Sequence, residues 1–542
     1  MKRNGEKKAA GNLRGALRLF LGAFFLVILD SCSVKEATYP LELSGRVILS
    51  NTSYRNYKIE KVHVYSRNGT KLYGSAIPQE ITNSLGLTEW HWSKLIPIDD
   101  GVDCTFWVEL SNPANKRLYY NQGTEDYVIA GAQYDLPVKE VQIPIFTPSE
   151  LRKIGTDTAL YPMEENYVLI CDISLSGEWE PFGTSAETAF SGNFNGNYRT
   201  ISNLRLAGGV REYIGFFGYI RNANVKNLIL VLSNDTIRLS TTTKQSLGSL
   251  SGYVENSNIE NILVRGGPNG MQIEKIGGAN FRIGGIVGTF TSTSTKSTQT
   301  GSTNPNFKYQ IKACGVEMPI AVYNDNFATS MDSSAYGGIV GLVYREERGT
   351  DAVEIQKCYS SDVISAATNS IASGGGIVGL LNDKTTDVGA ISRLCLTVSE
   401  CYNSGDISGE GYSIYCGGII GSVTAGGLNP VKIRMENTAA INAKITISST
   451  FMDGAGRIIG YNYDVIWDNP STASPPSSSP DSVYAYSNMI VVPGGYGTEG
   501  NDVTYSSLLQ ESWYIVTMDF DFNDTWIWNY RLKRPVFKWV NN

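Results

Sequence analysis

The sequence predicts an all-β protein in which a small antiparallel β-sandwich is followed by a β-solenoid. Short glycine-framed units recur through the larger half of the chain, and an earlier stretch alternates apolar and polar residues. Gly, Ser, Thr, Ile and Val dominate the repeats without a 3.6-residue apolar period, which disfavours a helical solenoid. The 542 residues are enough for several domains.

The first 31 residues indicate a signal peptide. Residues 1–18 are basic, and Leu19–Leu29 form an eleven-residue apolar run. A helix of that length rises about 16 Å, which is too short for a bilayer core of about 30 Å. We therefore expect a secretory signal over 1–31, and no later run is apolar and long enough to span a membrane.

The apolar run ends in Leu29-Asp30-Ser31-Cys32, which resembles the lipobox of bacterial lipoproteins. The resemblance implies cleavage before Cys32, diacylglycerol on its thiol, and anchoring of the mature chain in outer-membrane lipid with residues 32–40 as a tether. The protein would then face outward from the cell envelope. An ordinary secretory signal with a chance cysteine is the alternative.

The alternation of apolar and polar residues over 41–146 predicts a small antiparallel β-sandwich of about seven strands. Asn68-Gly69 is a typical hairpin turn. We expect His63 and His91, which lie in this domain, to be structural residues. The alternating segments are Leu41–Leu49, Lys61–Tyr65, Thr105–Leu110 and Lys139–Ile145.

A short helix start marks the boundary with the second domain. In Thr147-Pro-Ser-Glu-Leu-Arg-Lys, Thr147 or Ser149 is a good N-cap. We assign residues 147–542 to the solenoid.

The first repeated unit of the solenoid is an apolar stretch framed by glycines. Its closing glycines lie 34 to 53 residues apart. We expect the framing glycines to adopt positive φ and turn the chain. The copies are Gly215-Phe-Phe-Gly218, Gly248-Ser-Leu-Ser-Gly252, Gly284-Gly-Ile-Val-Gly288, Gly337-Gly-Ile-Val-Gly341, Gly375-Gly-Ile-Val-Gly379, Gly417-Gly-Ile-Ile-Gly421 and Gly456-Arg-Ile-Ile-Gly460.

A second unit follows each of the first six copies. Stacked copies would bury a continuous core and place like residues above one another. Cys314, Cys358 and Cys401 share one position, so we expect a buried ladder; a redox or metal trio is the alternative. The copies are Val225–Leu228, Ile259–Ile262, Ile311–Cys314, Ile355–Cys358, Val398–Cys401 and Ile433–Glu436.

Variable inserts separate the two units. One of them, residues 289–306, is rich in Ser and Thr, and others cover 344–353 and 382–394. Inserts of this kind gather on one face of a solenoid, often the binding face. The alternative for any single loop is a tolerated insertion without a function.

The GGIVG units followed by Ile355-Gln-Lys-Cys358-Tyr359 and Val398-Ser-Glu-Cys401-Tyr402 resemble the GLUG repeat family of bacterial surface proteins. The resemblance covers residues 147–542. It implies a right-handed parallel β-helix on a lipoprotein of the Bacteroidetes type. Members are commonly described as adhesin-like, some are attached to proteases, and many have no known ligand.

The end of a solenoid needs a cap over its unpaired edge groups. An aromatic tail over about 500–542 is our candidate for this cap, with Trp513, Trp526, Trp528 and Trp539 as its apolar core. A sugar-binding aromatic stripe is the alternative.

Charge and composition exclude several classes of function. After residue 31 the chain has 39 basic against 50 acidic side chains, so it should not bind nucleic acid. Besides Cys32 the chain has seven cysteines, without CxxC spacing, and two histidines. It has no GxSxG, HExxH or P-loop, so we predict no catalytic, cofactor or metal site.

We therefore expect a monomeric adhesin-like protein that binds a glycan or a host or matrix ligand without catalysis. The first alternative is a β-helix polysaccharide lyase or glycosidase that uses paired carboxylates or a Lys or Arg base. The available acids include Asp519, Asp521 and Asp524, but acids are common at turns, so no catalytic pair can be chosen from the sequence. A purely structural envelope protein is the other alternative.

Overall fold

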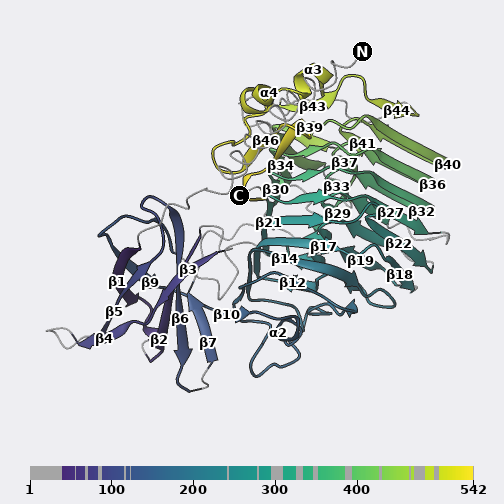
Figure 1. Cartoon of the computed structure of the whole chain (residues 1–542). Helices are drawn as coiled ribbons and strands as arrows, with labels where there is room; N and C mark the ends of the chain where they lie inside the picture. Colours follow the sequence, from purple (N-terminus) through teal and green to yellow (C-terminus); the bar gives the residue numbers. More distant parts are fainter. Residues whose placement is uncertain are drawn as a thin grey trace, which may run out of the picture. The chain divides into compact units, whose positions relative to one another are not determined.

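The computed structural model divides into two compact units, which are described separately (Figure 1). The first unit ends at Glu140, and the second begins at Val141 and includes Leu118–Tyr120. Cys32 lies outside the described residues. The structure describes residues 40–54, 56–66, 71–82, 88–114, 117–121, 124–240, 243–277, 280–293, 309–324, 334–345, 352–384, 394–425, 430–462, 465–468, 482–493 and 500–540.

The first unit is a β-sandwich with sheets β4-β5-β1-β9 and β3-β2-β6-β8. The ring of Phe106 lies 5.8 Å from that of Trp92 and 4.5 Å from that of Tyr134, so one core joins both sheets. We expected purely antiparallel pairing, but β1 and β9 are parallel. The elements are β1 (Leu41–Leu49), η1 (Thr52–Tyr54), β2 (Lys58–Ser66), β3 (Leu72–Ala76), β4 (Gln79–Thr82), β5 (Thr88–Ile96), β6 (Asp103–Asn112), β8 (Thr124–Tyr127) and β9 (Gln133–Val138). Most of β7 (Arg117–Asn121) belongs to the second unit.

Both histidines make contacts within this sandwich. His63 is buried, with Nε2 3.0 Å from Glu109 Oε2 and Nδ1 2.8 Å from Ser75 Oγ, which ties three adjacent strands together. His91 Nε2 lies 2.9 Å from Glu89 Oε2 on the same strand. These contacts agree with the structural role that we expected.

The second unit starts earlier than the sequence predicted. Strand β10 (Val141–Ile145) pairs in parallel with β11, so it belongs to the solenoid and not to the sandwich. Helix α2 (Pro148–Leu151) follows. The Thr147 hydroxyl accepts the Glu150 N–H, and the Glu150 carboxylate accepts the Thr147 N–H, so the predicted N-cap is confirmed at Thr147.

The solenoid is a parallel β-helix, as the sequence predicted. Successive coils stack in register as three long sheets, which we call sheets I, II and III (Figure 1). Sheet I comprises β11 (Tyr167–Leu169), β12 (Ile173–Ser174), β13 (Glu178–Trp179), β14 (Asn193–Leu206), β17 (Asn224–Leu232), β21 (Asn258–Arg265), β25 (Gln310–Lys312), β26 (Gly315–Glu317), β30 (Val353–Gln356), β31 (Tyr359–Ser360), β34 (Leu394–Ser399), β35 (Tyr402–Asn403), β38 (Val431–Glu436), β39 (Thr438–Ala440), β42 (Val465–Trp467), β43 (Val483–Tyr486) and β45 (Asn501–Val503).

Sheets II and III complete each coil. Sheet II comprises β15 (Tyr213–Ile214), β18 (Thr236–Ser240), β19 (Gln245–Gly248), β22 (Met271–Ile276), β23 (Phe281–Gly284), β27 (Ile320–Asn324), β28 (Ser334–Gly337), β32 (Ile364–Gly375), β36 (Ile407–Gly417), β40 (Lys444–Gly456) and β44 (Ile490–Val492). Sheet III comprises β16 (Phe217–Arg221), β20 (Ser251–Glu255), β24 (Val287–Thr291), β29 (Val340–Arg345), β33 (Val378–Asp383), β37 (Ile420–Ala425) and β41 (Ile459–Asn462).

We expected the framing glycines to turn the chain by adopting positive φ, and this expectation was wrong. Gly284, Gly337, Gly375 and Gly417 lie where sheet II meets sheet III, and none of them has positive φ. A Cβ on Gly337 would lie 2.0 Å from the carbonyl oxygen of Val340. These glycines are required because backbone approaches backbone too closely for any side chain.

Positive φ occurs instead at the third position of the second unit, in sheet I. The strand register shows that the sixth copy is Met435–Thr438, and our assignment of Ile433–Glu436 was wrong. The residues with positive φ at this position are Asn227, Asn261, Ala313, Lys357, Glu400 and Asn437.

The predicted cysteine ladder is confirmed. Cys314, Cys358 and Cys401 are fully buried and free, and each thiol donates to the carbonyl oxygen two residues earlier, at 3.1–3.2 Å. In the next coil the Thr438 hydroxyl makes the equivalent bond to Glu436, at 2.8 Å. Burial raises the pKa of the Cys358 and Cys401 thiols well above the usual value, as expected of inert core residues.

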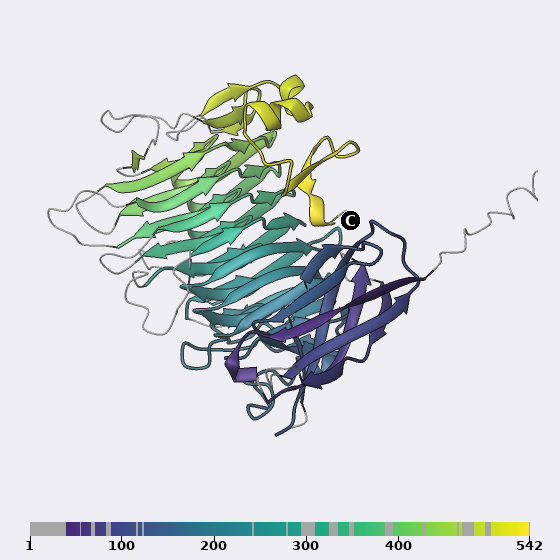
Figure 2. The same ribbon diagram turned by 90° about the vertical axis from the view of Figure 1, so that its left-hand side faces the viewer.

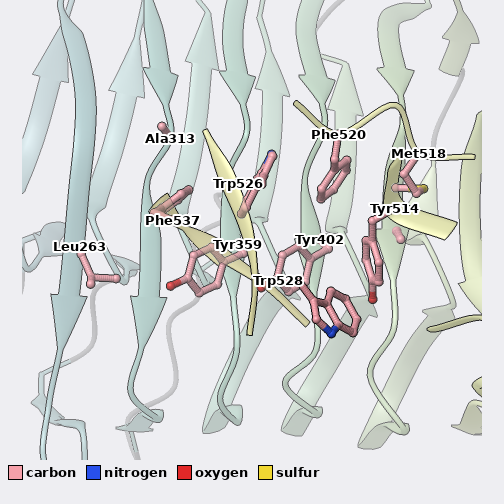
Figure 3. Packing of buried hydrophobic residues seen from close by; sticks show 11 residues of the cluster. Leu263, Ala313, Tyr359, Tyr402, Tyr514, Met518, Phe520, Trp526, Trp528 and Phe537 are labelled. Atoms are coloured by element: carbon pink, nitrogen blue, oxygen red, sulfur yellow. The ribbon is translucent and has the colours of Figure 1, made fainter. Parts of the chain in front are cut away.

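The aromatic tail does not simply cover the end of the solenoid. It runs back along the stack and packs on the outward side of sheet I (Figures 2 and 3). The Trp526 ring lies 6.1 Å from that of Tyr359 and 6.0 Å from that of Tyr402. Its elements are α3 (Tyr505–Leu508), α4 (Glu511–Val516), β46 (Trp526–Asn529), β47 (Arg534–Phe537) and η2 (Lys538–Val540).

Most of the predicted inserts lie outside the described residues. The ends of these segments that are described are strand and not loop: Thr289–Thr291 belong to β24, and Tyr344 and Arg345 belong to β29. No helix in the described part of the chain is both long and apolar enough to cross a bilayer.

Candidate functional site

The outward face of sheet II carries a long groove. It lies over β18, β22, β27, β32, β36 and β40, which Figure 1 shows stacked side by side. Adjacent strands in a sheet are about 4.8 Å apart, so six strands span about 24 Å. The central hollow of this groove has a volume of about 580 Å³.

Strand alternation determines which side chains line the groove. Ile320, Ile364, Ile407 and Ile445 are aligned and buried in the core, so the residue after each of them points outward. Every second residue of these strands therefore faces the groove.

The outward positions form two columns in register. Column one consists of Thr236, Gln272, Ala321, Ser365, Ser408 and Thr446. Column two consists of Arg238, Glu274, Tyr323, Ala367, Glu410 and Ser448.

The columns differ in chemistry. In column one, four of the six side chains carry a hydroxyl and none carries a charge. In column two the small Ala367 lies between Tyr323, which is 54% exposed, and Glu410. Column two thus offers an aromatic ring and a carboxylate on either side of a gap, beside the hydroxyl-bearing floor of column one.

A second hollow of about 400 Å³ adjoins the groove at its N-terminal end and shares Thr236 with it. Arg205 lies in this hollow between two carboxylates: its Nε is 3.4 Å from Asp235 Oδ2 and 3.9 Å from Glu178 Oε1. Those two oxygens are therefore at most 7.3 Å apart. The three side chains are 48% to 60% exposed.

An exposed aromatic pair follows Glu410 along the same strands. The rings of Tyr412 and Phe451 stack with their centroids 5.1 Å apart and their planes 3° from parallel. Phe451 is 65% exposed. The pair offers a second flat apolar surface on sheet II.

In the described part of the chain, no group of three or more His, Cys, Asp and Glu side chains is placed to hold a metal ion. The predicted lipidation residue, Cys32, lies outside that part.

Of the three tail carboxylates, Asp521 has a structural role. Lys357 Nζ donates to Asp521 Oδ2 at 2.9 Å, and the hydrogen bond lowers the pKa of the Asp521 carboxyl. The other oxygen of Asp521 accepts the N–H groups of Asn523 and Asp524. Asp521 therefore orders a turn and attaches the tail to sheet I.

The groove was not predicted from the sequence, because the binding face was expected at the inserts and the groove lies on the strands of sheet II. A third repeated pattern was present in the strands: Ile320-Ala-Val-Tyr, Ile364-Ser-Ala-Ala, Ile407-Ser-Gly-Glu and Ile445-Thr-Ile-Ser. An aligned isoleucine followed by a small outward residue is the signal that would have found it.

Comparisons with known proteins identify no family. No family model matches the chain. Halomucin of Haloquadratum walsbyi is 28% identical over 160 residues, which is 27% of this chain and 2% of halomucin. Among solved structures, an IgA1 protease aligns with 83% of this chain and 32% of its own, at 15% identity and a TM-score of 0.33.

Proposed function

We propose that this protein is a non-catalytic, outward-facing protein of the cell envelope that binds a glycan along the groove of sheet II. The observation that best supports the proposal is the lining of the groove, where hydroxyl side chains run beside the exposed Tyr323 and the Glu410 carboxylate.

Sugars match this lining in two ways. Their hydroxyls both donate and accept hydrogen bonds, as Ser365, Ser408 and Thr446 do, and Glu410 accepts from paired hydroxyls. The apolar face of a sugar ring stacks on an aromatic side chain such as Tyr323. A shallow groove about 24 Å long fits an extended chain better than a single small molecule.

The test is a glycan screen of residues 33–542 followed by two tryptophan variants. Ser408→Trp fills the groove and should reduce binding at least tenfold. Thr397→Trp, on the outward side of β34 in sheet I, should bind like the natural protein. Binding that survives Ser408→Trp would move the site away from the groove, and the absence of any glycan binding would leave a protein ligand or a purely structural role.

A carbohydrate-active enzyme is the second candidate. Glu178 Oε1 and Asp235 Oδ2 are at most 7.3 Å apart in a hollow that adjoins the groove, and paired carboxylates of glycosidases are about 5–9.5 Å apart. Against it, an acid–base pair needs one carboxyl in an apolar environment, whereas these two are exposed and flank a guanidinium.

The enzyme candidate is tested by incubating each bound glycan with the protein and measuring new reducing ends or unsaturated products. An intact glycan supports the non-catalytic proposal. Turnover that Asp235→Asn abolishes would replace it with the enzyme.

Membrane anchoring through Cys32 is part of the proposal, as is membership of the GLUG repeat family. The chemistry of a lipobox requires the thiol, so Cys32→Ser should abolish incorporation of labelled fatty acid and release the protein from the membrane fraction. Release without any loss of label, or label retained in the variant, would contradict acylation at Cys32.

A further inference from the structure

The cationic side chains of the groove all have carboxylate partners. Arg238 Nε lies 2.9 Å from Glu274 Oε2, at the point where the two hollows meet. Arg205 pairs with Asp235 and Glu178, and Arg211 donates to Glu180. An anionic ligand would have to compete with these carboxylates for each guanidinium.

Glu410 is different from those acids. Its side chain is exposed in the central hollow and makes no ion pair or hydrogen bond with any residue that the structure describes. Its neighbours across the strands are Ala367 and Ser448, which are uncharged. The carboxylate therefore presents a free negative charge and unused acceptor oxygens to whatever occupies the groove.

The charge of the central hollow then discriminates between ligands. A sulfate or uronate group at Ala367 would lie one strand from Glu410, and the described residues that line the central hollow include no lysine or arginine to offset the repulsion. A neutral sugar there would donate its hydroxyls to Glu410 and exchange hydrogen bonds with column one.

We infer that the groove selects neutral glycans and rejects sulfated or uronate-rich ones. This inference rests on the proposed function, because it specifies the class of glycan that the same groove holds. The free carboxylate of Glu410 and the pairing of Arg205, Arg211 and Arg238 with acids are the features that carry it.

The test compares neutral and sulfated polymers of one backbone, dextran against dextran sulfate and the bound polymers of the glycan screen against their sulfated forms. The full mature chain is used with Glu410→Gln and Glu410→Arg. The control is Glu164→Arg, an exposed glutamate outside sheet II. Because Glu410 is exposed, both variants should fold.

We expect the natural protein to bind the neutral member of a pair at least tenfold more tightly than the sulfated member. Glu410→Gln should weaken neutral binding about tenfold, since a charged hydrogen-bond acceptor is lost. Glu410→Arg should reverse the preference, and Glu164→Arg should leave it unchanged.

Two results would overturn the inference. Tighter binding of the sulfated polymer that Ser408→Trp removes would show that the groove holds glycans but prefers anions, so the proposed function would survive alone. Absence of any binding sensitive to Ser408→Trp would remove the proposed function and the inference together.

Discussion

Six coils hold a residue with positive φ at one position of sheet I, and three of those residues are neither asparagine nor glycine. Positive φ costs most L-residues about 1–2 kcal/mol. Ala313 has φ of 51° at this position, and it is buried against the tail. Its strain should be relieved by glycine at the cost of one buried methyl group.

Ala313→Gly should therefore change the free energy of unfolding by less than about 1 kcal/mol, because relief of strain offsets the lost methyl burial. Ala335→Gly, in a buried strand without positive φ, should destabilise the protein by about 1–2 kcal/mol. Chemical denaturation of both variants measures the difference. Equal destabilisation would show that the left-handed position is not strained.

Lys275 is a charged residue inside the coil. It is 1% exposed, its Nζ donates to Gln245 Oε1 at 2.7 Å, and burial lowers its pKa to about 8. In an unfolded chain the lysine pKa is about 10.4. Between pH 8 and 10 the unfolded state thus binds more protons than the folded state, so stability rises with pH.

The natural protein should gain up to about 3 kcal/mol of stability between pH 7.5 and 10 from this residue. Lys275→Met should lack that gain and be more stable than the natural protein at pH 7. Denaturation midpoints at a series of pH values test this. A rise of the same size in the variant would assign the pH dependence to other groups.

The tail is the segment for which the predicted and the observed role differ most. Its aromatic side chains cover outward residues of sheet I from several coils, including Leu263, Tyr359 and Tyr402 (Figure 3). The Tyr402 hydroxyl donates to the Pro535 carbonyl at 2.6 Å. The tail therefore holds neighbouring coils together along one side.

Trp526→Ala should destabilise the protein by about 3–5 kcal/mol, because the ring is fully buried in this cluster. Ile527→Ala changes the next residue of β46, which is 37% exposed, and should cost less than about 1 kcal/mol. Thermal unfolding of both variants measures the contrast. Similar small losses would mean that the tail packs only loosely on sheet I.

The tail should also respond to acid. The pKa of Asp521 is lowered by its hydrogen bond to Lys357, so its contribution is complete above about pH 4 and is lost as the pH falls below that value. Burial raises the pKa of the neighbouring Glu400, which acts in the opposite direction.

Hydrogen exchange of the tail peptides should therefore accelerate between pH 4 and 2.5, after correction for intrinsic rates, while the coils remain protected. Asp521→Asn should remove most of this acceleration and exchange faster at pH 6. A tail that stays equally protected at pH 2.5 would contradict the role of the Lys357–Asp521 pair.

At the scale of the whole molecule, the sequence was sufficient to predict the β-helix fold, because apolar residues recur in every coil. It could not give the reason for the glycines, since close approach of Gly337 to Val340 exists only once coils are stacked. The misaligned sixth copy has a similar cause: Thr438 replaces a cysteine by making the same hydrogen bond, which the letters alone do not show.

The groove could not be predicted from the sequence, for a related reason. Tyr323, Ala367 and Glu410 are 44 and 43 residues apart along the chain, and only the strand register brings them into one column. The tryptophans of the tail are visible in the sequence as a cluster near the C-terminus. Their position on the side of the coils depends on contacts with Tyr359 and Tyr402, more than 100 residues earlier.

The most direct test of the account is a crystal structure of the mature chain with the tightest-binding neutral oligosaccharide from the screen. We predict sugar rings along columns one and two, with one ring against Tyr323 and hydroxyls donating to Glu410. A sugar bound only at the inserts, along the tail, or between Glu178 and Asp235 in a cleaved form would contradict the assignment of the groove on sheet II.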